Sequence, residues 1–262
     1  MPNLKDIATT VARQRKIEGI PKLKPTSLGD LYIPDSFKHI WSGSGLTKFL
    51  QYDEGMESGP NRFIIFSTEQ NLVFLGQVET VFSDGTFSIT PPLFEQLYTI
   101  HGTIISSTYP LAFVLMPNKQ QQTYESVLEK LKELTSNFNP SQIMTDFEKA
   151  AINAYKDAFP ASTQKGCFFH LLQSIFRKIQ SMKEVYSRFR NEAEFARQCR
   201  KLGALAFVPP GDVVHALEEL ESSEFYTKNS ILDPLVAYFE VTYIGKPVRS
   251  RGMRKTPMFP IR

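Results

Sequence analysis

The stretch ETVFSDG, residues 79–85, decides the fold. Its first four residues are rich in β-branched and aromatic side chains and predict a short strand, while the Ser83-Asp84-Gly85 ending is typical of a turn. Downstream, residues 96–105 are again rich in aromatic and β-branched types, and residues 109–115 form a nearly continuous apolar run. The sequence therefore predicts three consecutive strands that begin a sheet as a meander.

The pattern then changes to helices that alternate with short strands. Apolar residues recur at helical spacing in 123–134, 148–159 and 167–180, and between them 143–145 and 163–166 are each long enough only for a short strand. A meander that continues as β–α–β units implies parallel strands and covering helices. We therefore expect an α/β fold with a mixed sheet flanked by helices.

Three segments follow from these patterns. Residues 1–60 are rich in Pro, Gly and Ser with short apolar runs, and predict a leader with little independent structure. Residues 61–182 hold the sheet and its helices, opening with a strand at 62–66 and a short helix at 69–75. In residues 183–262 the strand signal almost disappears, so we expect a helical insertion or appendage that ends in a basic tail.

Composition limits the class of protein. Hydrophobic residues make up 42% of the 262 residues and charged residues 22%, which are ordinary values for a globular chain and argue against disorder. No run of eighteen apolar residues and no signal peptide are visible, so we expect a protein that stays inside the cell and contacts no membrane. Cys167 and Cys199 are too few for a disulfide framework.

The net charge of +3 is unevenly distributed. Asp and Glu are absent after Glu240, whereas basic residues continue to the end of the chain. Such a cluster suits a DNA backbone, because displaced counterions drive sequence-independent binding; the alternative is a solvated terminus. The candidate DNA-backbone contacts are Lys246, Arg249, Arg251, Arg254 and Lys255.

Asp84 and Asp146 are the candidate catalytic and metal-binding residues. Each directly follows a short apolar strand, and functional side chains of open α/β sheets gather beyond strand ends. If the two strands are neighbours, the carboxylates share one cleft, where their repulsion favours a bound cation. Oxygen ligands favour Mg²⁺ or Mn²⁺. The alternative is that Asp84 only opens a turn with Gly85 and that Asp146 caps a helix.

A pair of divalent ions held by such carboxylates supports one type of chemistry. The ions activate water or a DNA 3′-hydroxyl and stabilise the departing oxygen in an in-line attack on phosphorus. The site therefore predicts nuclease and strand-transfer activity.

Several blocks of sequence carry a resemblance to a known family. FSDGTF (82–87), QLYTIHG (96–102), PLA (110–112), MTDFEKAA (144–151) and GCFFHL (166–171) fall in the order and spacing of MULE (Mutator-like) transposase domains. The chain most resembles those found beside FLYWCH zinc fingers, although no zinc-finger pattern precedes its core.

The resemblance implies a ribonuclease-H-like fold and a DDE transposase. Its first and second acids match Asp84 and Asp146, with Mg²⁺ as the cofactor. The implied partners are the ends of a mobile element and its target DNA, in the nucleus. A homo-oligomer is left open.

The third acid of that family is a Glu that we expect to follow the block PMFPI at residues 257–261, but the chain stops at Arg262. We therefore expect a fragment or a degenerate copy, and whether it is an enzyme stays open. The alternative function is an inactive transposase relic that binds DNA. Other acids offer substitutes by position, although a solvated helix face is the competing interpretation for Glu218, Glu219, Glu221 and Glu240.

Cys167 and His170 form a C-x-x-H pair at the start of a helix. The spacing suits two zinc ligands, but no matching second pair is visible, and packing against the sheet is the alternative. The family resemblance places this pair beside the active site. It implies a supporting or DNA-contact role for both residues.

Overall fold

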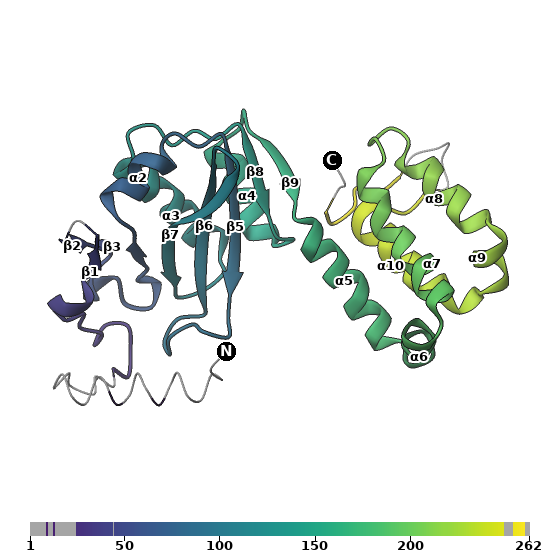
Figure 1. The fold of residues 1–262 in the computed structure, drawn as a ribbon, viewed down its shortest axis with the longest axis horizontal. Helices are drawn as coiled ribbons and strands as arrows, with labels where there is room; N and C mark the ends of the chain where they lie inside the picture. Colours follow the sequence, from purple (N-terminus) through teal and green to yellow (C-terminus); the bar gives the residue numbers. More distant parts are fainter. Residues whose placement is uncertain (1–8, 10–12, 14–24, 44, 249–253, 260–262) are drawn as a thin grey trace.

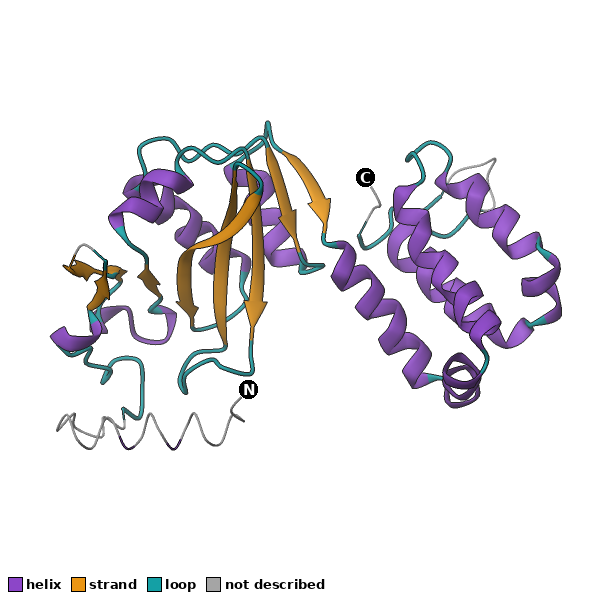
Figure 2. Cartoon of the chain, in the orientation of Figure 1, coloured by secondary structure: helices purple, strands orange, loops and turns teal. Residues whose placement is uncertain are grey.

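The structure is a computed structural model that describes residues 9, 13, 25–43, 45–248 and 254–259. It contains a mixed sheet with its helices and, to one side, a group of helices (Figures 1 and 2). The described elements are the 3₁₀-helix η1 (Asp35–Phe37), β1 (His39–Ser42), β2 (Gly45–Lys48), β3 (Leu50–Asp53), the 3₁₀-helix η2 (Met56–Asn61), β4 (Ile64–Phe66), α2 (Glu69–Leu75), β5 (Thr80–Thr86), β6 (Gln96–Ile104), β7 (Ser107–Met116), α3 (Gln121–Leu134), β8 (Gln142–Thr145), α4 (Lys149–Ala158), β9 (Thr163–Gly166), α5 (Phe168–Ser181), α6 (Lys183–Asn191), α7 (Ala193–Ala204), the 3₁₀-helix η3 (Leu205–Phe207), α8 (Val213–Ser222), α9 (Glu224–Lys228), the 3₁₀-helix η4 (Ser230–Leu232), α10 (Asp233–Phe239) and the π-helix η5 (Glu240–Ile244).

Within the described residues, seven strands form the main sheet in the order β3-β4-β7-β6-β5-β8-β9. The pairs from β3 to β5 are antiparallel, whereas β5–β8 and β8–β9 are parallel. The predicted meander is therefore β5-β6-β7, and the two strands that alternate with helices extend the sheet beyond β5. The expected mixed sheet flanked by helices is confirmed.

One face of the sheet carries the hydrophobic core. Along β5, Val81 and Ser83 are buried, while Phe82 and Asp84 alternate to the other side and are partly exposed. Helices α3 and α4 supply Tyr124 and other apolar residues to the same core. Alternation with period two thus places Asp84 on the less covered face.

Part of the expected leader belongs to the sheet. Residues 50–53 form the edge strand β3, which pairs with β4. The Arg62 side chain, only 2% exposed, holds this region in place. Its guanidinium donates to both carboxylate oxygens of Asp53, at 2.7 and 2.6 Å, and to the carbonyls of Leu28 and Leu31, both at 2.7 Å. A buried guanidinium needs such partners, so it ties residues near 30 to the core.

Helices α5 to α10 form a second hydrophobic core. Figure 1 shows α5 leading from β9 into this group. Phe147, directly after Asp146, contacts the group at two rings, with centroid distances of 5.2 Å to Tyr243 and 5.4 Å to Phe259. Across the described part of the chain, no helix combines the length and apolar character needed to span a bilayer.

Candidate active site

The two candidate acids occupy matching positions on neighbouring parallel strands. In the β5–β8 pairing, Ser83 lies opposite Thr145, so Asp84 and Asp146 each come one residue later. Asp146 directly follows β8, as the sequence predicts. Asp84 lies inside β5, which continues to Thr86 instead of turning at Gly85. Its pairing with Thr99 of β6 explains the difference, because β6 extends the ladder past the expected turn.

Asp146 is a partly buried carboxyl in an anionic setting. Burial raises its pKa to about 6, and the charges of Glu148 and Asp84 act in the same direction, whereas His170 and the backbone N–H of Glu148 oppose them. Asp146 is not the cap of the next helix, because α4 begins at Lys149 with Glu148 as its N-cap. The alternative interpretation, in which Asp146 caps a helix, is therefore wrong.

His170 lies beside the acid pair. Its Nε2 is 3.6 Å from Asp84 Oδ1, and its side chain is 23% exposed against 49% for Asp84. Its Nδ1 is buried without a hydrogen-bond partner. Cys167 is the N-cap of α5, and its backbone N–H donates to the Thr145 carbonyl at 2.8 Å. This bond fastens the start of α5 to the end of β8 and thereby brings His170 toward Asp84.

Glu148 is a third carboxylate near the pair that sequence reasoning missed as a site residue. It accepts a hydrogen bond from Tyr124 Oη at 2.5 Å and lies 3.4 Å from Lys119 Nζ. The Lys119 ammonium also sits 3.8 Å from the Phe87 ring centroid. The sequence did contain an indication of this role, because Glu148 follows Asp146 by only two residues. The same glutamate also fits the start of the next helix, so its sequence position alone did not identify it as a site residue.

Carboxylate oxygens such as those of Asp84 and Asp146 are the type of ligand that hard divalent cations prefer. Burial contributes most to the cost of ionising Asp146, the charges of Glu148 and Asp84 add to it, and a cation would relieve that repulsion. In the portion of the chain that is described, no group of three or more His, Cys, Asp or Glu residues is arranged to hold a metal ion. Three of the four substitute acids have other partners, because Glu218 and Glu240 face Arg254 and Glu219 faces His215. The fourth, Glu221, lies among acids of the helical group, where burial raises its pKa.

The basic tail is only partly free for DNA. Arg254 Nη1 lies 2.6 Å from Glu240 Oε1 and donates to the Gly245 carbonyl at 2.7 Å, and Arg254 Nη2 is 3.5 Å from Glu218. The expectation of an unopposed tail is therefore wrong for Arg254, because the fold returns this segment to earlier acids. Lys246 and Lys255 are exposed. Two further candidates lie outside the described residues: Arg249 and Arg251.

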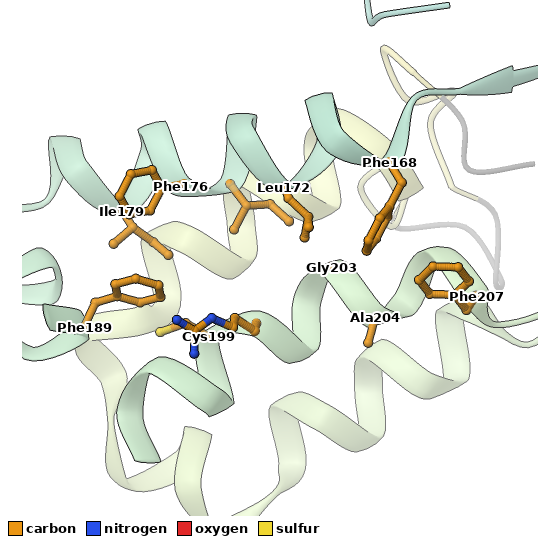
Figure 3. A pocket seen from close by; sticks show the side chains of 11 residues that line it. Phe168, Leu172, Phe176, Ile179, Phe189, Cys199, Gly203, Ala204 and Phe207 are labelled. Atoms are coloured by element: carbon orange, nitrogen blue, oxygen red, sulfur yellow. The ribbon is translucent and has the colours of Figure 1, made fainter. Parts of the chain in front are cut away.

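A separate apolar groove of about 440 Å³ lies in the helical group. Figure 3 shows Phe168, Leu172 and Phe176 of α5 facing it from one side and Gly203 and Phe207 from the other. Neither Asp84 nor Asp146 lines it. The groove is thus distinct from the acid pair.

Comparison with known proteins gives a family match over part of the chain. A curated relative, the PKS-NRPS hybrid synthetase cheA of Chaetomium globosum, is 30% identical over 76 residues, which are 28% of this chain and 2% of that protein. The Drosophila P element transposase strand transfer complex matches at 10% identity, covering 68% of this chain and 53% of that chain, with a TM-score of 0.27. Residues 80–174, which hold Asp84, Asp146 and His170, match the model of the MULE transposase domain.

Proposed function

We propose that the chain is a transposase-derived protein whose sheet carries the core for metal-dependent DNA strand cleavage and strand transfer. The observation that carries this proposal is the placement of Asp84 and Asp146 at matching positions of two neighbouring parallel strands. Both acids fall within the residues that match the MULE transposase domain. The meander followed by two parallel strands supports a ribonuclease-H-like assignment.

Asp84 and Asp146 would hold the cation, Mg²⁺ or Mn²⁺ by the preference of oxygen ligands. When bound, such an ion activates the attacking hydroxyl and stabilises negative charge at the reacting phosphate. Asp84 is half exposed and presents its carboxylate where a DNA backbone can approach. His170 contacts Asp84 on one side and limits the orientations of that carboxylate.

The proposed DNA-binding surface contains the exposed side chains of Lys246 and Lys255. Arg249 and Arg251 belong to it as sequence predictions. Arg254 is left out, because its charge is neutralised by Glu240 and Glu218. Nuclear location, the FLYWCH association and self-association stay predictions.

Nicking of supercoiled plasmid by the purified chain tests the function. We expect Mn²⁺- or Mg²⁺-dependent nicking that is lost in Asp84→Ala and Asp146→Ala and kept in the control Glu219→Gln, whose side chain is on an exposed helix face. Nicking that is equal in all four proteins would overturn the assignment. Plasmid binding without nicking would favour the alternative, a DNA-binding relic.

A further inference from the structure

Three polar side chains near the two acids are linked by hydrogen bonds, from the buried Gln96 and Tyr124 to the partly exposed Glu148. Gln96 opens β6 and is 0% exposed, and Tyr124 on α3 is 1% exposed. Gln96 Nε2 donates to Tyr124 Oη at 2.6 Å, and Tyr124 Oη–H donates to Glu148 Oε1 at 2.5 Å. Since the tyrosine hydrogen is used on Glu148, its oxygen must accept from Gln96, which fixes the orientation of the amide.

At one end of this hydrogen-bonded series, the Gln96 side chain contacts the backbone of the residue after Asp84. A methyl group added at Gly85 would lie only 2.3 Å from Gln96 Oε1, so the Gln96 amide packs directly against this glycine. Gln96 Oε1 is itself buried without a hydrogen-bond partner.

The other end holds the backbone after Asp146. Glu148 accepts the Tyr124 hydrogen bond on its side chain, and its backbone N–H lies close enough to the Asp146 carboxyl to lower the pKa of that group. The orientation of Asp146 therefore depends on where Glu148 is held. The Tyr124 ring is fixed in turn by an edge contact with Tyr98, at 5.1 Å between centroids.

We propose that Gln96, Tyr124 and Glu148 form a brace that sets the placement of Asp146 relative to Asp84 and so tunes the cation site. The three are positioning residues, and none is needed as a ligand. The inference rests on the proposed function, because it assumes that the two acids bind a divalent cation. Hydrogen-bonded partners that orient metal-binding carboxylates commonly change metal affinity by 10- to 100-fold when mutated.

Mn²⁺ titration of the full chain followed by electron paramagnetic resonance tests the brace. Tyr124→Phe keeps the buried ring and removes the hydrogen bond to Glu148, and we expect roughly tenfold weaker Mn²⁺ binding. The control Tyr226→Phe removes a hydroxyl of matched burial, which donates to the Gln198 carbonyl in the helical group, and should leave the affinity unchanged. Equal affinity in Tyr124→Phe and wild type would overturn the proposal.

Two variants of Glu148 separate the brace from simple charge. Glu148→Gln keeps an oxygen that accepts from Tyr124, whereas Glu148→Ala removes it. The brace predicts affinity near wild type for Gln and a loss for Ala. Equal losses in both would mean that only the negative charge of Glu148 matters, and would contradict it.

A metal-free readout makes failure of the brace distinguishable from failure of the proposed function. Hydrogen exchange of the Glu148 backbone N–H should be faster in Tyr124→Phe and unchanged in Tyr226→Phe. If Asp84→Asn does not weaken Mn²⁺ binding, the proposed function fails, whatever the exchange shows. If Asp84→Asn weakens binding and Tyr124→Phe alters neither binding nor exchange, the brace alone fails.

Discussion

Asp84 and Asp146 each lie one residue beyond the aligned pair formed by Ser83 and Thr145 on adjacent parallel strands. The two carboxylates therefore lie at the same edge of the sheet, although they are far apart in the sequence. Close approach of their charges has consequences for stability, pH dependence and ion binding.

The charge of Asp146 should destabilise the metal-free protein. Burial and the neighbouring acids raise its folded-state pKa to about 6, above the unfolded value of about 4. Unfolding then releases a proton between these two values, so the contribution of Asp146 to stability falls as pH rises from about 4 to about 6 and stays low above that.

Asp146→Asn should therefore stabilise the metal-free chain above pH 6 by about 1–2 kcal/mol, after allowing for its partial exposure, and should have little effect near pH 4. Urea unfolding in chelator at both pH values measures this. A stabilisation of equal size at pH 4 and pH 7 would show that the ionisation of Asp146 is not its source.

His170→Ala should lower plasmid nicking by roughly tenfold to a hundredfold, because the ring next to Asp84 no longer restricts its carboxylate. Initial rates across a range of Mn²⁺ concentrations give the measurement. His215→Ala is the matched control, since His215 contacts Glu219 on an exposed face of α8. Equal activity in the two variants would show that His170 has no role in the candidate active site.

Phe147 should couple the acid pair to the helical group. Phe147→Ala removes ring contacts with Tyr243 and Phe259 and should destabilise the chain by about 2–3 kcal/mol. Phe169→Ala, at a side chain that is 64% exposed, should change stability by less than about 0.5 kcal/mol. Thermal unfolding of the two variants measures the loss of stability. A smaller loss in Phe147→Ala than in Phe169→Ala would show that the Phe147 ring contacts do not link the acid pair to the helical group.

Arg254 should stabilise the folded protein through its ion pairs. Arg254→Ala leaves Glu240, only 18% exposed, without its partner and should cost about 1–3 kcal/mol in urea unfolding. The neighbouring exposed Lys255→Ala should have almost no effect. If the two substitutions destabilise equally, the ion pairs of Arg254 contribute nothing specific.

Local patterns were sufficient to predict most of the sheet and its helices. The helix expected at 69–75 is α2, where Thr68 caps the first turn by accepting from the Asn71 backbone N–H at 3.1 Å. The apolar stripe of 123–134 is the buried face of α3. Such features depend on residues close in sequence, so periodicity and capping reveal them.

The rest depends on contacts that no local pattern contains. Strand β3 joins the sheet by pairing with β4, and Arg254 meets Glu240 only after the chain folds back. The link between Tyr124 and Glu148 brings together side chains of two different helical segments. Local pattern placed Asp146 correctly after its strand, but it ended β5 too early at Asp84 and did not reveal the residues that orient the two acids.

Mn²⁺ binding to the metal-free chain tests the central claim most directly. Wild type, Asp84→Asn, Asp146→Asn and the exposed control Glu219→Gln would be titrated by electron paramagnetic resonance at pH 7.5, above the raised pKa of Asp146. Each Asn substitution should weaken Mn²⁺ binding at least tenfold, and Glu219→Gln should leave it unchanged. Wild-type affinity in either Asn variant would show that Asp84 and Asp146 do not bind the cation together.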